Sequence, residues 1–303
     1  MANLEHLARL KKGITAWQEW RVNQIGLEVD LSGADLRHLN LEGIDLSGVN
    51  LQATDLSHTS LIAADISRAN LSNAILHNTH LTDANLSQVD LTLAQLVDAN
   101  LQGVDLQEAN LIGADLRRVN LRGADLRATN LRGTSLTNAK LREANLSDAK
   151  LERASLSGAD LRQANLCQAN LSNTNLHEAE LIGAYLYRTN LSHANLSQVH
   201  LSAAHALEAN LSGANLTRAD LRWANLSGAN LSGANLSRAG LRGANLNRAN
   251  LQGANLRDVD FNGANLSRAN LHQADLQPTD LGEVTFNFAN LRGAIMPDGV
   301  VYR

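Results

Sequence analysis

The sequence of 303 residues has few of the features that mark secreted or membrane proteins. Cys167 is its single cysteine, so no disulfide can form within the chain and a reducing compartment fits. No apolar run approaches the ~20 residues that a membrane-spanning helix needs. The N-terminus lacks an uninterrupted apolar stretch and a small-residue cleavage site, which argues against a secretory signal. These absences predict a soluble, cytoplasmic protein without a membrane partner.

Aromatic residues and net charge are also scarce. Phe, Trp and Tyr make up 3% of the chain, as expected where Leu and Ala fill a narrow core. The formal net charge is −4 and the pI is about 6.2. The chain as a whole therefore has no electrostatic drive toward nucleic acid or an anionic membrane.

What the sequence does contain is a five-residue word repeated without interruption. Ala229–Gly233 and Ala234–Arg238 are two consecutive copies: a small residue, Asn or Asp, Leu, and two small or polar residues. A leucine-like residue recurs at every fifth position from Leu31 to Leu291, in 53 consecutive words. Such a period indicates a repeat architecture, so we expect one solenoid domain rather than two globular domains.

A period of five fits neither regular element. On a helix that turns about 100° per residue, leucines at this spacing scatter around the axis, and on a strand they alternate between the two faces. A chain that turns a corner after every word brings all the leucines to one axis. Four corners close a coil of 20 residues, and coils stacked at roughly 4.8 Å would number about thirteen. The pattern predicts an all-β solenoid.

Residues twenty positions apart then lie above one another. On this register, one face carries a continuous asparagine ladder made of Asn210, Asn230, Asn250, Asn270 and Asn290. The carboxylates of the chain occupy the same slot of the word as these asparagines, where an Asx side chain can bond the backbone of the turn. We interpret both as architectural.

These words resemble those of the pentapeptide-repeat family over about residues 27–296. The resemblance implies a right-handed quadrilateral β-helix, and the handedness rests on the resemblance alone. The segment before the repeats resembles the leaders of cyanobacterial members. We therefore expect three parts: a capping helix and lead-in at 1–26, the β-helix at 27–296, and a C-terminal tail at 297–303.

The capping helix is expected over residues 3–22. Leu4, Leu7, Leu10, Ile14 and Trp17 follow the spacing of one helical face, and Asn3 is a candidate N-cap. This face could cover the open edge of the first coil, which would otherwise promote aggregation. The alternative is a helix that binds a partner or a membrane surface.

A basic belt is expected in the middle of the chain, because residues 116–153 hold nine Lys or Arg against four Asp or Glu. It could bind an acidic partner or phosphate, or it could be a solvated surface with Glu143, Asp148 and Glu152 as local partners. No aromatic residue interleaves with the arginines, which makes nucleic acid an unlikely partner. The six candidate residues of the basic belt are Arg117, Arg122, Arg127, Arg132, Arg142 and Arg162.

The least regular words lie between residues 180 and 207, where Ala206 replaces the axial leucine. This substitution leaves either a cavity or a bulge that turns Leu207 inward. If the register holds, Leu207 stacks outside Tyr187 and His205 lies over Tyr185. We predict a partner-binding aromatic patch here, with drift as the alternative. Its candidate residues are Ile182, Tyr185, Tyr187, His205 and Leu207.

No catalytic or cofactor motif is present. His38 and His58 should stack beside His77, but no acidic or cysteine ligand stacks with them, so no metal site is expected. The glycines recur at spacing five, which matches neither the dinucleotide fingerprint nor a P-loop. We expect no catalysis, no cofactor and no metal.

The C-terminal end lacks room for a second lid, because twelve residues remain after Leu291. Bulky apolar residues gather there, and a tail-to-tail homodimer would cover both ends through one two-fold contact. The competing arrangement is a fold-back of residues 295–303 in a monomer. The candidate dimer contacts are Phe286, Phe288, Met296 and Tyr302.

These features together predict a non-catalytic scaffold that offers flat faces to a protein partner of unknown identity. The resemblance implies a regulatory role, since cyanobacterial relatives are linked to processes such as heterocyst differentiation. It also implies an alternative: a DNA mimic that binds or protects DNA gyrase or topoisomerase IV. Relatives with that role have strongly acidic surfaces, whereas this chain has a modest charge and a basic middle.

Overall fold

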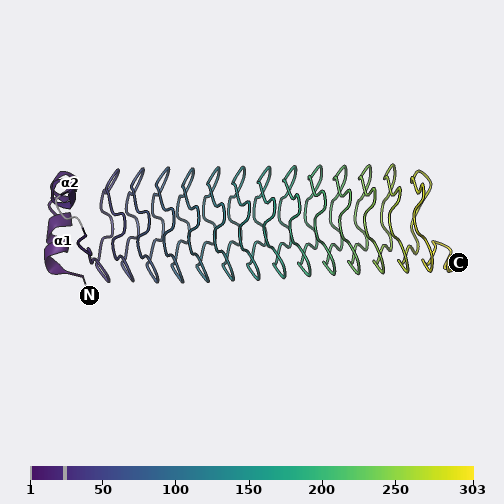
Figure 1. Ribbon diagram of the computed structural model, residues 1–303, viewed down its shortest axis with the longest axis horizontal. Coiled ribbons are helices and arrows are strands. Elements are labelled where there is room, and N and C mark those ends of the chain that lie inside the picture. Colours follow the sequence, from purple (N-terminus) through teal and green to yellow (C-terminus); the bar gives the residue numbers. More distant parts are fainter. Residues whose placement is uncertain (1, 23–25) are drawn as a thin grey trace. The chain divides into compact units, whose positions relative to one another are not determined.

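The computed structural model describes residues 2–22 and 26–303. The chain divides into two compact units, residues 1–145 and 146–303, which are described separately. Unit 1 begins with two helices, α1 (Leu4–Leu10) and α2 (Ile14–Val22). The rest of both units consists of similar coils, drawn in Figure 1 as successive loops.

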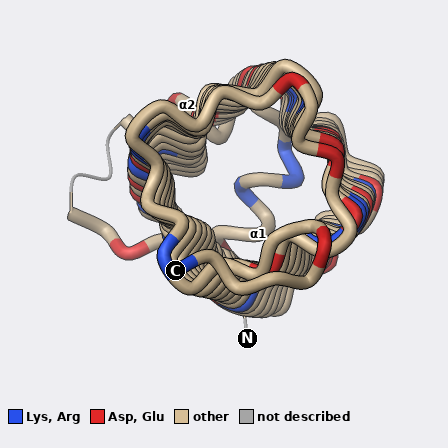
Figure 2. The backbone as a smooth tube through the Cα atoms, turned by 90° about the vertical axis from the view of Figure 1, so that its right-hand side faces the viewer, with Lys and Arg blue, Asp and Glu red and all other residues tan. Residues whose placement is uncertain are grey.

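Each coil contains 20 residues and joins the next through single-residue parallel β-bridges, such as those of Asn230 with Asn210 and Asn250. The N–H of Leu231 donates to the carbonyl of Asn250 at 2.7 Å, and the N–H of Asn230 donates to the carbonyl of Ala209 at 2.9 Å. The fold is the expected right-handed quadrilateral β-helix. Its four-sided outline is visible end-on in the last coils of unit 2 (Figure 2).

A tight turn forms every corner. The N–H of Ala234 donates to the carbonyl of Leu231 at 3.1 Å, and Gly233, the second of the two residues between them, has a φ of +63°. A positive φ at this position characterises a type II turn and favours glycine. Many words place another residue there, for example Arg238 at φ 60°. The regular hydrogen bonds to the adjacent coils hold the backbone of these residues in the left-handed region.

The axis of each unit is filled by the leucines of the words. Leu231 and Leu236 have no exposed surface, and neither does the small residue two positions before Leu231, Ala229. Burying each leucine contributes roughly 2 kcal/mol, while ordering five backbone residues costs roughly 1–2 kcal/mol each. A single word therefore cannot fold alone, and stability comes from stacking.

The predicted asparagine ladder is confirmed in unit 2. The Nδ2 of Asn230 donates to Oδ1 of Asn210 at 3.2 Å, and the same contact repeats up to Asn290, which donates to Asn270 at 2.9 Å. The Oδ1 of Asn230 also accepts the N–H of Ser232 at 3.2 Å. One amide thus stabilises both its own turn and the stacking of neighbouring coils.

The structure confirms one further prediction about register and decides between the two alternatives left open at Ala206. In unit 1 the rings of His38 and His58 are stacked, with their centroids 5.1 Å apart. In unit 2 the bridges run from Tyr185 to His205 and on to Asn225, so Ala206 stays on the axis. No bulge forms, and the neighbouring leucine keeps its outward position.

The N-terminal segment forms two short helices, which corrects the prediction of one continuous helix over 3–22. Gly13 separates them with a φ of +103°, a conformation that ends a right-handed helix. The break buries Leu10 and Trp17, which are 2% and 0% exposed. Leu4, expected on the same face, is 81% exposed and was wrongly assigned to it. Asn3 is the N-cap of α1, as predicted.

Together α1 and α2, the cap of unit 1, satisfy the open edge of the first coil. The Asn3 N–H donates to the Asp30 carbonyl at 3.0 Å, and the Asp30 N–H donates to Nδ1 of His6 at 3.1 Å. The Trp17 Nε1 donates to the Asp45 carbonyl at 2.7 Å, and the Arg21 guanidinium donates to the Ser47 carbonyl. In later coils the preceding coil supplies these partners, so the cap replaces a missing coil.

The C-terminal end of unit 2 is covered on one side only. The tail turns at Gly299 and returns, so that Ile295 and Val301 pair in antiparallel fashion. The backbone carbonyl of Tyr302 accepts the N–H of Gly293 at 2.7 Å, and the backbone N–H of Tyr302 donates to the carbonyl of Ala294 at 2.8 Å. This is the fold-back that was named as the arrangement competing with the dimer, and within residues 26–303 no segment covers the other sides of the last coil.

Removing the cap should expose the lower edge of the first coil. We expect a variant lacking residues 1–25 to form oligomers or aggregates, because unpaired backbone groups and apolar core would face water. Size-exclusion chromatography with light scattering measures this. Substituting the exposed Leu4 with Ser is the matched control and should change nothing. A monodisperse truncated protein with unchanged thermal unfolding would show that the cap does not protect the edge.

Candidate functional site

The five residues of the aromatic patch lie on neighbouring coils of unit 2. Tyr185 lies in the middle of a face, bridged to Asn165 below and His205 above. The His205 ring stacks on the Tyr185 ring with centroids 5.1 Å apart and planes 13° from parallel. Leu207 occupies the same position as Tyr187 one coil later, as shown by the hydrogen bond from the Arg188 N–H to the Leu207 carbonyl at 3.1 Å.

The apolar side chains of this patch reach solvent. Tyr185 is 50% exposed, Ile182 40% and Leu207 38%, whereas Tyr187 is half-buried. The guanidinium of Arg188 lies 5.0 Å from the centre of the Tyr187 ring and pairs with Glu208 at 2.7 Å. Its charge is therefore already compensated, and the patch presents rings and aliphatic groups rather than net charge.

One neighbour of the patch, Trp223, is not among the residues predicted for it from the sequence. Trp223 is 67% exposed and occupies the same corner as Ile182, two coils further along unit 2. A signal was present, since a tryptophan in a corner position otherwise held by small and polar residues is unusual in this chain. The indole lies over Gly243, where a Cβ would come within 2.3 Å of the ring.

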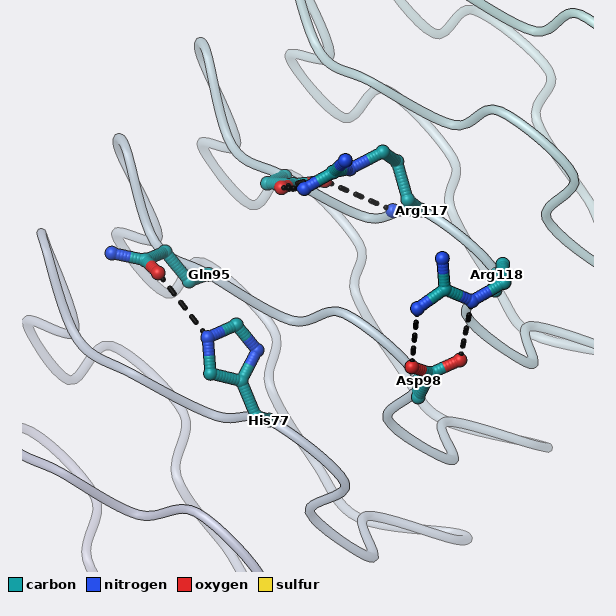
Figure 3. A network of polar contacts seen from close by, with 6 residues as sticks. His77, Gln95, Asp98, Arg117 and Arg118 are labelled. Atoms are coloured by element: carbon teal, nitrogen blue, oxygen red, sulfur yellow. Dashed lines mark hydrogen bonds and ion pairs between the residues drawn. The ribbon is translucent and has the colours of Figure 1, made fainter.

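Most of the basic belt lies in unit 1, where the arginines pair with carboxylates. Arg117 holds Asp115 with contacts down to 2.6 Å, and Arg118 holds Asp98 of the preceding coil at 2.6 and 2.8 Å (Figure 3). Nearby, a ring nitrogen of His77 lies 3.2 Å from Oε1 of Gln95. The belt is therefore a network of ion pairs, not a field of free positive charge.

A short motif explains much of this pairing. Whenever Asp, Leu and Arg are consecutive, the guanidinium folds back over the leucine onto the carboxylate two residues earlier. Both lie on the outside of the coil, so the contact forms within one word. The pairs are Asp35 with Arg37, Asp115 with Arg117, Asp125 with Arg127, Asp160 with Arg162 and Asp220 with Arg222.

This pairing adds partners to those expected for the belt. Glu143, one of the three acids proposed, pairs with Arg142 at 3.1 Å and with Arg122 at 3.8 Å. The stronger contacts come from the aspartates of the turn slot. Arg132 is exposed at its turn, and Arg162 belongs to unit 2. The side-chain hydrogen bond from Arg117 is the main reason why the pKa of Asp115 is lowered.

The candidate dimer residues lie at the C-terminal end of unit 2. Phe288 is 88% and Tyr302 49% exposed, whereas Phe286 and Met296 are half-buried. The axial residues Leu281 and Leu291 are also only half-buried, unlike the leucines of earlier coils. The end of the core is therefore partly open to solvent.

The described residues contain neither a metal-binding cluster nor a membrane-spanning helix. Over residues 2–22 and 26–303, no group of three or more His, Cys, Asp or Glu could hold a metal ion. No helix in the same ranges is both long and apolar enough to cross a membrane.

Family models define the class of protein to which this fold belongs. The model of pentapeptide repeats matches in eight copies, and that of a pentapeptide repeat region also matches. The chain therefore belongs to the pentapeptide-repeat family. The first model matches residues 94–133, 120–158, 154–192, 194–233, 224–263, 234–273 and 264–298, and the second matches residues 34–111.

Several solved structures are similar to this chain. HetL, a pentapeptide repeat protein involved in heterocyst differentiation regulation from the cyanobacterium Nostoc sp. strain PCC 7120, is 29% identical, with 94% of this chain and 97% of HetL covered and a TM-score of 0.39. QnrB1, a plasmid-mediated fluoroquinolone resistance protein, is 18% identical, with 59% and 89% covered and a TM-score of 0.44. Rfr23 from the cyanobacterium Cyanothece 51142 is 27% identical, with 45% and 96% covered and a TM-score of 0.28. No curated protein matches the chain.

The pairing in the belt can be tested at one carboxylate. In an Arg117→Gln variant, the pKa of Asp115 should rise toward its ordinary value of about 3.9, because its main donor is lost. Carbon-detected NMR of the carboxyl groups measures the shift. Asp98 is the internal control, because its pKa is lowered by Arg118 and should stay low.

The same variant has a defined effect on stability. A carboxylate whose pKa is lowered by folding stabilises the folded protein at pH values above its pKa in the unfolded chain. This stabilisation is lost as the pH falls through its pKa in the folded protein. The variant should therefore be less stable than the parent near neutral pH, with the difference vanishing in strong acid. An unchanged Asp115 pKa would show that the ion pair does not persist in solution.

Proposed function

We propose that this protein is a non-catalytic, regulatory scaffold of the cytoplasm that binds a protein partner through unit 2. In this proposal, residues 1–26 cap the β-helix of residues 27–296, and residues 297–303 form its tail. The observation that carries the proposal is the aromatic patch, which exposes apolar side chains on a solenoid coated with Ser, Asn and paired charges. Contiguous exposed apolar groups mark interaction sites in soluble proteins.

The chemistry of the patch suits a protein partner. Tyr, Trp and Arg dominate the residues that carry most of the energy at protein interfaces. Tyr185 offers a ring already immobilised by His205, so it loses little conformational freedom on binding. The ion pair between Arg188 and Glu208 lies beside the rings, where a polar rim would be expected.

The alternative role as a DNA mimic receives less support from the surface. A mimic needs rows of free carboxylates to imitate phosphates. Here the aspartates of the turn slot are often neutralised within their own word, as Asp115, Asp125 and Asp220 are. Acidic residues also exceed basic residues by only a few in the whole chain, which gives a net charge of −4.

The aromatic patch can be tested by a triple substitution. Changing Tyr185, Tyr187 and Leu207 to Ser should abolish capture of the partner from an extract of the source cells, because it removes the exposed apolar area. Outward side chains contribute little to the core, so the circular dichroism should not change.

The matched control removes exposed apolar groups elsewhere. Leu93 and Ile112 of unit 1 are 56% and 39% exposed, and a Leu93→Ser, Ile112→Ser variant should capture the same protein as the parent. Equal capture by the triple variant would remove the patch from consideration.

We also propose a tail-to-tail homodimer through Phe286, Phe288, Met296 and Tyr302. The fold-back of the tail provides hydrogen-bond partners for the N–H of Gly293 and the carbonyl of Ala294, but it leaves the rest of the last coil uncovered. A second copy has the same open end, so an isologous contact would cover both. Phe288, 88% exposed, would be buried in this contact.

Light scattering at micromolar concentration tests the dimer. The parent should weigh about twice the chain mass of 32.6 kDa. Substituting Phe288 and Tyr302 with Asp should halve that mass, since two charges per chain would have to be desolvated. The control is Trp223→Ala, which lies away from the end and should remain dimeric. A monomeric parent protein would contradict the proposal.

A further inference from the structure

The charge of unit 2 is unevenly distributed along its coils. Residues 211–270 contain seven arginines and no lysine, against three acidic residues, in a chain whose net charge is −4. Like charges at this density do not stabilise a fold, so they call for another explanation. The arginines are Arg218, Arg222, Arg238, Arg242, Arg248, Arg257 and Arg268.

Four of these arginines differ from those of the basic belt in having no partner. Arg222 is held by Asp220, Arg238 approaches Asp258 at 3.7 Å, and Arg257 contacts Gln277 and Asp275. The guanidinium groups of the other four make no ion pair and no hydrogen bond within the part of the chain that the structure describes. These four are Arg218, Arg242, Arg248 and Arg268.

An exposed aromatic ring lies among them. Trp223 is 67% exposed, and one face of its indole rests on the turn of the next coil at Gly243. The same corner of the following coil is again a glycine, Gly263. Neither glycine has a side chain that could cover the tryptophan, which remains 67% exposed.

The register places three of these arginines and the tryptophan on two adjacent corners of consecutive coils. One corner carries Trp223 and Arg242, since the Trp223 N–H donates to the Arg242 carbonyl at 2.9 Å. The following corner carries Arg248 and Arg268 on consecutive coils, which are spaced by roughly 5 Å. We call these four residues the arginine–tryptophan surface. Arg218 lies one corner before Trp223, diagonally opposite Arg248 on the four-sided coil, and is not part of this surface.

We propose that the arginine–tryptophan surface binds a short stretch of single-stranded nucleic acid. An unpaired base stacks on the open face of Trp223, an interaction that tolerates any base and contributes about 1–3 kcal/mol. Arg242, Arg248 and Arg268 bind the flanking phosphates, which guanidinium groups contact through paired hydrogen bonds. The basic belt of unit 1 lacks both an aromatic ring and free guanidinium groups, whereas this surface has both.

Two arguments limit the strandedness and the length of the nucleic acid that can bind. Base pairing would keep a base from reaching Trp223, so a duplex does not fit. Acidic residues border the surface: Asp260, Asp280 and Glu283 line a cavity of about 200 Å³ on the following coils. They would repel a long polyanion, which restricts the contact to a few nucleotides. An acidic peptide would use the arginines but leave the indole without a stacking partner.

The experiment measures binding of a fluorescein-labelled deoxythymidine 12-mer to the full chain by fluorescence anisotropy at several salt concentrations. The parent should bind, with an affinity that falls as salt rises. Replacing Arg242, Arg248 and Arg268 with Gln should weaken binding at least tenfold at low salt. The slope of log affinity against log salt should fall by about 2, because each phosphate contact to a single strand contributes about 0.7.

A Trp223→Ala variant tests the stacking separately. Ala203 occupies the same corner one coil earlier with a φ of 55°, so alanine is compatible with this turn. The variant should bind about 5- to 100-fold more weakly with an unchanged salt slope, whereas Trp223→Phe should retain most of the affinity. Binding should also quench the tryptophan fluorescence of the parent protein but not that of Trp223→Ala.

The matched control replaces Arg117, Arg127 and Arg162 with Gln, which changes the net charge by the same amount elsewhere, and it should leave binding within about twofold. Three results would overturn the proposal. The parent protein could fail to bind the 12-mer, or the control could lose as much affinity as the test variant. A poly-glutamate peptide could also compete as well as the 12-mer irrespective of Trp223, which would make the surface a docking site for acidic protein segments.

Discussion

The hydrogen bonds between consecutive coils are the interaction on which the rest of the structure depends. Each word sends one N–H forward from its leucine and one backward from its Asx position, as Leu231 and Asn230 do. These contacts lock residues twenty positions apart into register. Once they form, the leucines within each unit share one axis, and every outward position of that unit becomes a vertical column. The asparagine ladder, the stacked histidines and the tyrosine–histidine pair are all consequences of this register.

The same constraint explains why the two ends of the chain differ. A coil without a neighbour leaves backbone donors and acceptors unpaired, which is costly and promotes aggregation. Unit 1 solves this with the cap, whose His6, Trp17 and Arg21 side chains replace the contacts of a missing coil. Unit 2 ends with a hairpin at Ile295 and Val301 that covers one side. The open remainder is the reason for proposing a second copy there.

Charge on this fold is largely compensated locally, and the exceptions are therefore informative. A guanidinium that follows Asp and Leu returns to its own carboxylate, as in Asp115 and Arg117. Such words contribute little to recognition. Two surfaces offer other chemistry: the aromatic patch around Tyr185 exposes rings while its charges stay paired, and the rule itself fails at the unpaired arginines around Trp223.

The sequence alone determined the fold class, the length of the coil and the columns of side chains. These follow from a period of five that recurs in every word, so a local pattern carried global information. At Ala206 the sequence left two alternatives, and the β-bridges of the structure decided that this residue keeps the register and that Leu207 points outward. The Asp-Leu-Arg contact was equally local and could have been found from the words themselves.

Only the tertiary structure decided the rest. The N-terminal pattern of apolar residues indicated one helix, but docking onto the first coil favoured a break at Gly13 that buries both Leu10 and Trp17. Which arginines stay unpaired depends on contacts between adjacent coils, such as Arg118 with Asp98 and Arg188 with Glu208. The indole of Trp223 could be placed only when Gly243 was seen beneath it. Each of these outcomes depends on side chains that meet across twenty or more residues, and a repeating word does not encode them.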